Sequence, residues 1–213
     1  MAATLLGVWN IACASVGERS LASTAEAREP QRLLNEVWTR GNGAEKFFLE
    51  QGLWNFAMKE SSSTSASTGN FNFAYVHNVP TDFVRLAAIS ADPTFGFPLT
   101  RYEWYSSHID ADVTPIYLRY VSDSTSLGKD LSKWPDTFTL WAGHWLGTQI
   151  APRLKNDIDR EALRKETRDL LYDAQSKDAS QEPTRWPPLS SWAQARLSGR
   201  GRGDRGNRGS LTG

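Results

Sequence analysis

The chain has 213 residues, of which 39% are hydrophobic, and its 24 basic residues balance its 24 acidic residues. This length suits one domain, or one domain with a long appendage. The zero formal net charge excludes a global attraction to nucleic acid or to an anionic membrane.

Nine tryptophans are spread over most of the chain. A core of this modest apolar content does not easily bury all of them, and large aromatic side chains are common in interfaces as well as in cores. We therefore expect some tryptophans to face partner subunits. The single cysteine, Cys13, can form no disulfide within the chain, which is typical of a reducing compartment.

Residues 3–16 are predicted to form an amphipathic helix that ends at Gly17, with Cys13 as a small buried apolar residue. A signal peptide would carry Lys or Arg before this apolar run, and a lipoprotein site would usually have Leu where Asn10 stands. No stretch is long and apolar enough to span a bilayer. We therefore expect no membrane anchor.

A second helix is expected to begin at a cap on Ser23 or Thr24 and to end near Gln51, with Gly52 as its C-cap. The segment RGNGAE at 40–45 weakens this helix, because two glycines cost about 2 kcal/mol relative to alanine. Either the helix breaks there or close packing against a neighbour compensates, and we favour one interrupted helix.

The segment GLWNFAMKE, residues 52–60, places Trp54 and Phe56 on either side of an asparagine at the exit from this helix. Both aromatic side chains are expected to fold back under the helix end. They either plug the end of a core or lock the helices onto the β region that follows, and we assign them to this junction.

The middle of the chain shows the alternation typical of strands. Residues 60–70, ESSSTSASTGN, are interpreted as a flexible loop. Apolar residues then alternate on both sides of a turn at 80–82, and the segment 102–121 is predicted to form two or three more strands, with turns at 106–107 and 111–114. These features predict a small antiparallel sheet inserted between helices.

Two helices are predicted to follow the sheet. Residues 135–151 carry a wide apolar stripe typical of a central helix, with Pro135 in its first turn and Pro152 at its end. Residues 157–178 form the last helix, which has one apolar stripe and a second face of alternating charges.

Together these elements predict an α+β fold, which is a mainly α-helical bundle with an inserted small antiparallel β region and an extended C-terminal arm. The expected domains are an N-terminal helical pair (1–58), the inserted β region (59–125), C-terminal helices that complete the bundle (126–178) and an Arg/Gly-rich docking arm (179–213).

The C-terminal segment cannot build a core of its own, and between residues 181 and 213 it has six arginines and two acidic residues. It is a solvated disordered end, a segment that binds RNA or DNA through phosphates, or a docking arm that orders on a partner. Trp186 and Trp192 favour docking, because such arms need a few large buried side chains. The tripeptide RGD at 202–204 follows from the Arg/Gly composition and does not indicate adhesion.

Patterns typical of catalysis or metal binding are absent from the sequence. Three histidines lack the spacing of metal ligands; they are His77, His108 and His144. The segment DADVT at 110–114 lacks the Gly and Glu of a calcium loop. No phosphate-binding loop, GxSxG or Cys–His arrangement is present. We expect no enzymatic activity, no cofactor and no metal.

Two carboxylate pairs were considered for the acid and base of a glycosidase, Glu18 with Glu26 and Glu103 with Asp110. Nothing in the sequence brings either pair together. A cell-wall hydrolase is therefore a further class of function, and it has no named site.

The order of several segments resembles the head-to-tail adaptor proteins of tailed bacteriophages, of the tail tubular protein A type. The resemblance extends over most of the chain and depends on order and spacing, not on one motif. The similar segments, in chain order, are TLLGVWNIACASVGE, AEAREPQRLLNEVW, GLWNFAMKE, YVHNVPTDFVRLAAI, IYLRYV, FTLWAGHWLGTQIAPRL, DAQSKDASQEP and SSWAQAR. Two features depart from the family pattern, which are the Gly41 and Gly43 interruption and the Gly/Arg extension after Arg196.

This resemblance implies a structural virion protein at the head–tail junction, made in the cytoplasm of the host bacterium. It implies a ring of about twelve copies beneath the portal protein, which extends the channel for genomic DNA and provides the platform for a downstream tail or nozzle protein. In such a ring, Trp54 and Phe56 would fix the wedge angle of each subunit.

The C-terminal arm would then reach onto the portal, and many copies acting together would make the joint effectively permanent. Trp186 and Trp192 are the expected buried anchors. The residues assigned to portal docking are Arg185, Trp186, Trp192, Arg196, Arg200 and Arg202. Alternatively, the arginines face packaged DNA, or the chain is a nucleic-acid-binding protein that uses its basic Arg/Gly tail.

Overall fold

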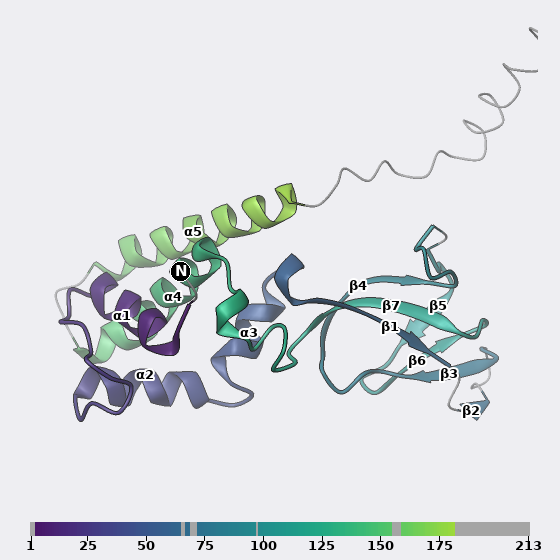
Figure 1. Ribbon diagram of the computed structural model, residues 1–213, viewed down its shortest axis with the longest axis horizontal. Coiled ribbons are helices and arrows are strands. Elements are labelled where there is room, and N and C mark those ends of the chain that lie inside the picture. The colour runs from purple at the N-terminus through teal and green to yellow at the C-terminus, as the bar shows by residue number, and fades with distance from the viewer. Residues whose placement is uncertain (1–2, 65–66, 69–71, 97, 155–158, 182–213) are drawn as a thin grey trace, which may run out of the picture. The chain divides into compact units, whose positions relative to one another are not determined.

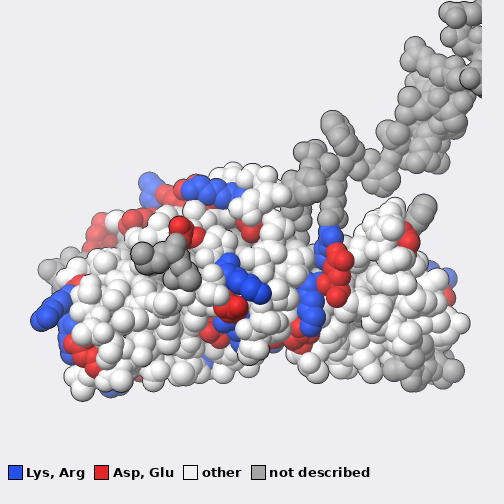
Figure 2. Space-filling view, viewed as in Figure 1, with Lys and Arg blue, Asp and Glu red and all other residues white. Residues whose placement is uncertain are grey.

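Helices and antiparallel strands make up the regular part of the chain (Figure 1). The computed structural model describes residues 3–64, 67–68, 72–96, 98–154 and 159–181. Residues 1–181 form one unit. Figure 2 shows acidic and basic side chains interspersed on the visible face, in keeping with the zero formal net charge.

Helix α1 (Leu5–Ser15) confirms the helix predicted for residues 3–16. It begins at Thr4, whose hydroxyl accepts a hydrogen bond from the Gly7 amide (3.1 Å). It ends at Gly17, where a φ of 66° allows the Glu18 amide to donate to the Cys13 carbonyl (2.8 Å). Cys13 is fully buried as expected, and burial raises the pKa of its thiol.

The expected single second helix is wrong, because the chain forms two helices, α2 (Glu29–Thr39) and α3 (Ala44–Glu50). Gly41 and Gly43 lie between them with φ values of 61° and 88°, a region that glycine enters without steric cost. The two glycines therefore turn the backbone instead of interrupting one helix. The start differs from expectation, since α2 is preceded by Arg28. The helical segment ends near Gln51 as expected, but the C-cap is Gln51 and not Gly52.

Helix α4 (Asp136–Leu154) is the central helix, as predicted, and α1, α2 and α5 (Arg160–Ser180) all pack against it. Helices α1 and α4 approach each other closely at Gly143, where an added Cβ would lie 2.6 Å from Ile11 Cβ and 3.1 Å from the Val8 carbonyl oxygen. Pro152 lies inside the last turn of α4 and does not end it at 151. The Asp159 carboxylate caps α5 by accepting from the Glu161 and Ala162 amides.

In the part of the chain that the structure describes, seven strands form two antiparallel sheets. The first has the order β1 (Met58–Ser63), β7 (Ile116–Ser122) and β4 (Phe83–Ser90). The second has the order β2 (Ser67–Thr68), β3 (Tyr75–Asn78), β6 (His108–Ala111) and β5 (Tyr102–Trp104). Their apolar side chains form a hydrophobic cluster separate from that of the helices; its buried members are Ile89, Ile109, Ala111, Ile116, Leu118 and Tyr120.

The predicted fold class is wrong, because the chain has a mixed α+β fold and not a helical bundle with a small β insertion. The error begins at residues 60–70, which were interpreted as a loop. Residues 58–63 form β1, in which Ser61 pairs with Leu118 and Ser63 with Ile116 of β7. Serine has little strand preference of its own, so the pairing with a buried central strand decides the conformation here.

Short 3₁₀ turns precede the first sheet and α4; they are η1 (Asn55–Ala57) and η2 (Leu131–Lys133). The domain boundaries given above stay predictions. Residues 182–213, which include all six residues assigned to portal docking, lie outside the described residues.

Candidate functional site

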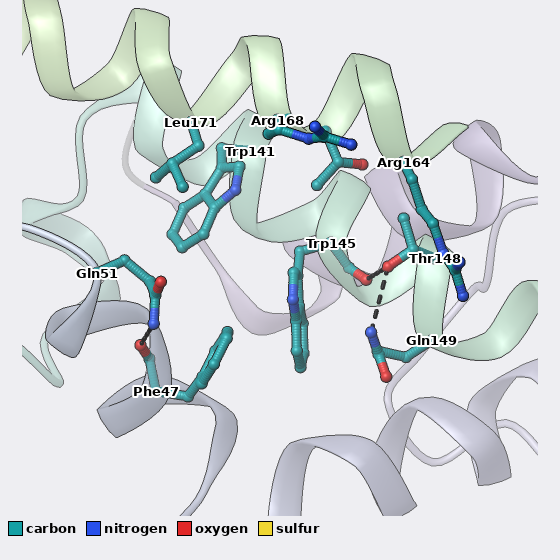
Figure 3. A pocket seen from close by; sticks show the side chains of 10 residues that line it. Phe47, Gln51, Trp141, Trp145, Thr148, Gln149, Arg164, Arg168 and Leu171 are labelled. Carbon is teal, nitrogen blue, oxygen red and sulfur yellow. Dashed lines mark hydrogen bonds between the residues drawn. The ribbon is translucent and has the colours of Figure 1, made fainter. Parts of the chain in front are cut away.

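A groove of about 360 Å³ opens between α3, α4 and α5 (Figure 3). Its lining combines aromatic and aliphatic side chains, four uncharged polar side chains and two arginines. The lining residues are Phe47, Gln51, Trp141, Trp145, Thr148, Gln149, Arg164, Thr167, Arg168 and Leu171. Pockets for small ligands or protruding side chains are lined in this way, with apolar walls and a few polar groups.

Two aromatic rings form the apolar side of the groove. Phe47 projects from α3 and Trp145 from α4, and their ring centroids lie 4.7 Å apart (Figure 3). Phe48, the neighbour of Phe47, is fully buried, whereas 37% of Phe47 is exposed. Phe47 therefore lies at the boundary of the helical core and offers apolar surface to a partner.

Arg164 and Arg168 extend from α5 one helical turn apart, and both are exposed. Two arginines on other helices are paired, Arg153 with Glu36 (2.8 Å) and Arg32 with Glu29. Within the described residues, neither Arg164 nor Arg168 has an ion pair or a hydrogen bond. The groove therefore presents two positive charges that are available to an acidic partner.

The polar side chains of the groove are held by local hydrogen bonds. Gln51 Nε2 donates to the Phe47 carbonyl (3.2 Å), and Thr148 Oγ1 donates to the Trp145 carbonyl (2.6 Å). Gln149 Nε2 donates to Thr148 Oγ1 (3.3 Å). These bonds orient the lining (Figure 3), while the two arginines remain free to reach a ligand.

A second exposed surface, the β5–β6 tip, consists of Glu103, Trp104 and Tyr105 at the end of β5. Trp104 and Tyr105 are 39% and 41% exposed, which is unusual for side chains of this size. The Tyr105 hydroxyl donates to Glu103 Oε2 (2.7 Å), and this bond to a carboxylate raises the pKa of Tyr105. The tip is thus aromatic and acidic.

Neighbouring aromatic rings of the sheet support the tip. Trp104 packs on Phe83 with ring centroids 4.8 Å apart, and Tyr105 stacks on His108 at 4.6 Å. The Tyr105 amide donates to the His108 carbonyl (2.9 Å), which closes the hairpin turn. The tip can therefore bind a partner with little loss of side-chain entropy.

Trp54 and Phe56, the predicted junction residues, both lie against Phe138 of α4, at centroid distances of 4.7 and 4.9 Å. Trp54 is buried, and its Nε1 donates to the Phe48 carbonyl (3.1 Å). The space for its ring comes from Gly52, because a Cβ there would lie 2.8 Å from Trp54 Cε2. Their role in fixing a wedge angle stays a prediction.

Three residues that sequence reasoning missed hold separate segments of the chain together. Arg85 Nη1 donates to the Glu50 carbonyl at the end of α3 (3.1 Å). Asp82 accepts hydrogen bonds from β1 and β7, and Asp178 of α5 binds the η1 turn. Arg85 and Asp82 lie within the YVHNVPTDFVRLAAI segment and Asp178 within DAQSKDASQEP. In the sequence, these three residues could be found only through the resemblance of the segments that contain them.

The considered carboxylate pairs have other partners. Glu18 and Glu26 both approach Arg28, at 3.8 and 3.5 Å. Glu103 and Asp110 are opposite each other in the β5–β6 register, but Asp110 is buried and Glu103 belongs to the tip. Neither pair is therefore arranged as the acid and base of a glycosidase on two sides of a substrate.

Two of the three histidines lie near one carboxylate each, His108 near Asp110 (3.6 Å) and His144 near Glu166 (3.8 Å). Among the residues whose positions are described, no three His, Cys, Asp or Glu side chains gather in a way suited to a metal ion. His77 is buried between the Ser63 carbonyl (3.1 Å from Nδ1) and the Val113 carbonyl (3.0 Å from Nε2). It therefore ties β3 of the second sheet to the end of β1 in the first sheet and to the segment between β6 and β7.

No protein-family model matches the sequence, and no curated protein matches it. Within residues 3–154 and 159–181, every described helix is too short or too polar to cross a bilayer. Function is therefore argued from the two exposed surfaces and from the order of the sequence segments.

Proposed function

We propose that the protein is a head-to-tail adaptor of a tailed bacteriophage. It forms a ring beneath the portal protein, extends the channel for DNA and provides the attachment platform for the tail. Its role is structural and not enzymatic, and its place is the head–tail junction of the virion. The C-terminal arm, with Trp186 and Trp192 as anchors, docks on the portal.

The observation that carries this proposal is a contact between two of the segments that resemble the family. Asn55 of GLWNFAMKE binds Asp178 of DAQSKDASQEP, although they lie 123 positions apart in the chain. Two segments of the resemblance are therefore neighbours in the fold, as segments of one structural framework would be. The two exposed aromatic and charged surfaces add support, because ring subunits need complementary faces.

The test is to mix the purified protein with portal rings of the same phage and to image the mixture by electron microscopy. We expect coaxial rings in which the adaptor lies below the portal, and loss of portal binding when residues 182–213 are deleted. Unchanged binding by the truncated chain would exclude the arm, and a chain that never joins the portal would exclude the function.

The nucleic-acid-binding alternative has a different signature. The excess of arginine in residues 181–213 would give binding to free DNA that weakens steeply with salt. The adaptor proposal expects little affinity for free DNA, so a fluorescence anisotropy titration at two salt concentrations distinguishes the two.

A further inference from the structure

We infer that the β5–β6 tip of one copy of this chain inserts into the groove of the next copy. This contact rests on the proposed ring and specifies which two surfaces form it. Both surfaces are exposed in the same chain. The groove has positive charges without an acidic partner among the described residues, and the tip has an exposed carboxylate.

Charge is the first argument. The groove carries Arg164 and Arg168, which have no ion pair or hydrogen bond within the described part of the chain. The tip carries the exposed carboxylate of Glu103, whose one hydrogen bond within the described residues comes from the neutral Tyr105 hydroxyl. An arginine can bind a carboxylate through two parallel hydrogen bonds, which gives both strength and orientation.

Shape and polarity are the second argument. A groove of about 360 Å³ is at the small end of protein pockets, which range from roughly 300 to 1,000 Å³. It suits one or two protruding side chains, not a helix. Trp104 and Tyr105 are 39% and 41% exposed, and this exposed surface can pack on the ring of Phe47 beside Trp145.

Other occupants fit less well. The chain's own C-terminal segment has six arginines and two acidic residues after residue 180, so it would place like charges against Arg164 and Arg168. If two grooves met symmetrically, their arginines would face each other and repel. If two tips met, their Glu103 carboxylates would face each other and repel. A contact between two different surfaces remains, and such head-to-tail contacts close into rings or extend into filaments.

The experiment uses charge reversal in the full-length chain. Arg168→Glu and Glu103→Arg should each raise the concentration needed for self-assembly at least about tenfold, because like charges then meet across the contact. Assembly is measured by mass photometry and sedimentation. Both side chains are exposed, so unchanged circular dichroism and melting temperature will show that folding is intact.

Mixing gives the sharper result. A mixture of equal amounts of the two variants pairs an acidic groove with a basic tip and a basic groove with an acidic tip, so assembly should return. The chain that carries both substitutions should also assemble. Two matched controls, Lys165→Glu and Asp173→Arg, change exposed charges on α5 outside the groove lining and should assemble like the unmodified chain.

The outcomes separate this contact from the proposed function. If the unmodified chain forms rings on the portal and both reversals assemble normally, the contact is wrong and the adaptor function stands. If reversal blocks assembly and mixing restores it, but the assemblies ignore the portal, the contact stands and the adaptor function fails. If deletion of residues 182–213 abolishes self-assembly, the tail and not the tip occupies the groove, and the inference is overturned.

Discussion

Asn55 and Asp178 hold the η1 turn against the last turn of α5. The Asn55 amide donates to both carboxylate oxygens of Asp178, at 3.1 and 3.0 Å, and Asn55 Nδ2 donates to the Asp178 carbonyl (2.7 Å). Asp178 is only 8% exposed, so these bonds are largely shielded from water. They fix the end of α5, the point from which the C-terminal segment departs.

The first prediction tests this contact. Asp178→Ala should lower the free energy of unfolding by about 1 to 3 kcal/mol, because the partly buried Asn55 amide loses a charged acceptor. Chemical denaturation measures this loss. Asp173→Ala, on the exposed face of the same helix, should change stability by less than about 0.5 kcal/mol. Equal effects of the two substitutions would refute a structural role for Asp178.

The second prediction concerns acid stability and Asp82. Burial alone would raise the pKa of this carboxyl, but hydrogen bonds from Lys59 (2.7 Å), Ser122 (2.6 Å) and Tyr120 (3.0 Å) outweigh burial and lower the pKa below 3.8. The folded state then binds this proton less readily than the unfolded state. The resulting stabilisation is present above about pH 4 and is lost as the pH falls through the lowered pKa.

Asp82→Asn removes this titration. At pH 7 the variant should lose about 1 to 2 kcal/mol of stability, because Ser122 and Tyr120 donate to a weaker acceptor. Between pH 5 and pH 2.5, its melting temperature should fall less than that of the unmodified chain. Parallel slopes for the two proteins in thermal melts over this range would show that Asp82 is not the titrating group.

The third prediction concerns the close approach of α1 and α4. In an ordinary helix, replacing glycine by alanine stabilises by up to about 1 kcal/mol. Gly143→Ala should instead destabilise by about 1 to 3 kcal/mol, because the new Cβ would meet the Ile11 side chain and the Val8 carbonyl. Gly96→Ala, at an exposed position with ordinary contacts, is the control for denaturant unfolding. A stabilised Gly143→Ala chain would contradict the packing described.

The fourth prediction compares neighbouring residues of α3. Phe48→Ala should lower stability by about 3 to 5 kcal/mol, because Phe48 is fully buried. Phe47→Ala should lower it by about 1 kcal/mol or less but weaken self-assembly, because its exposed ring belongs to the groove. Unfolding and mass photometry measure the two effects separately. Normal assembly of Phe47→Ala would remove the apolar part of the proposed contact.

The sequence by itself determined the elements whose signals are local. Gly17 marked the end of the first helix, the apolar stripe identified α4 as central, and strand alternation identified strands within 83–90 and 102–122. Burial of Cys13 followed from its place in the helical stripe. Each of these depends on side chains within a few turns or on one strand, which periodicity records directly.

Only the tertiary structure decided the rest. β1 is a strand because residues 58–63 pair with β7, almost sixty positions later, and no local preference of its serines indicates this. The groove likewise takes Phe47, Trp145 and Arg168 from three helices. In the sequence, Arg168 resembles any solvated charge; its one signal is that no acidic residue lies three or four positions away. Pairing and grooves arise from contacts between distant segments, which a periodic pattern does not contain.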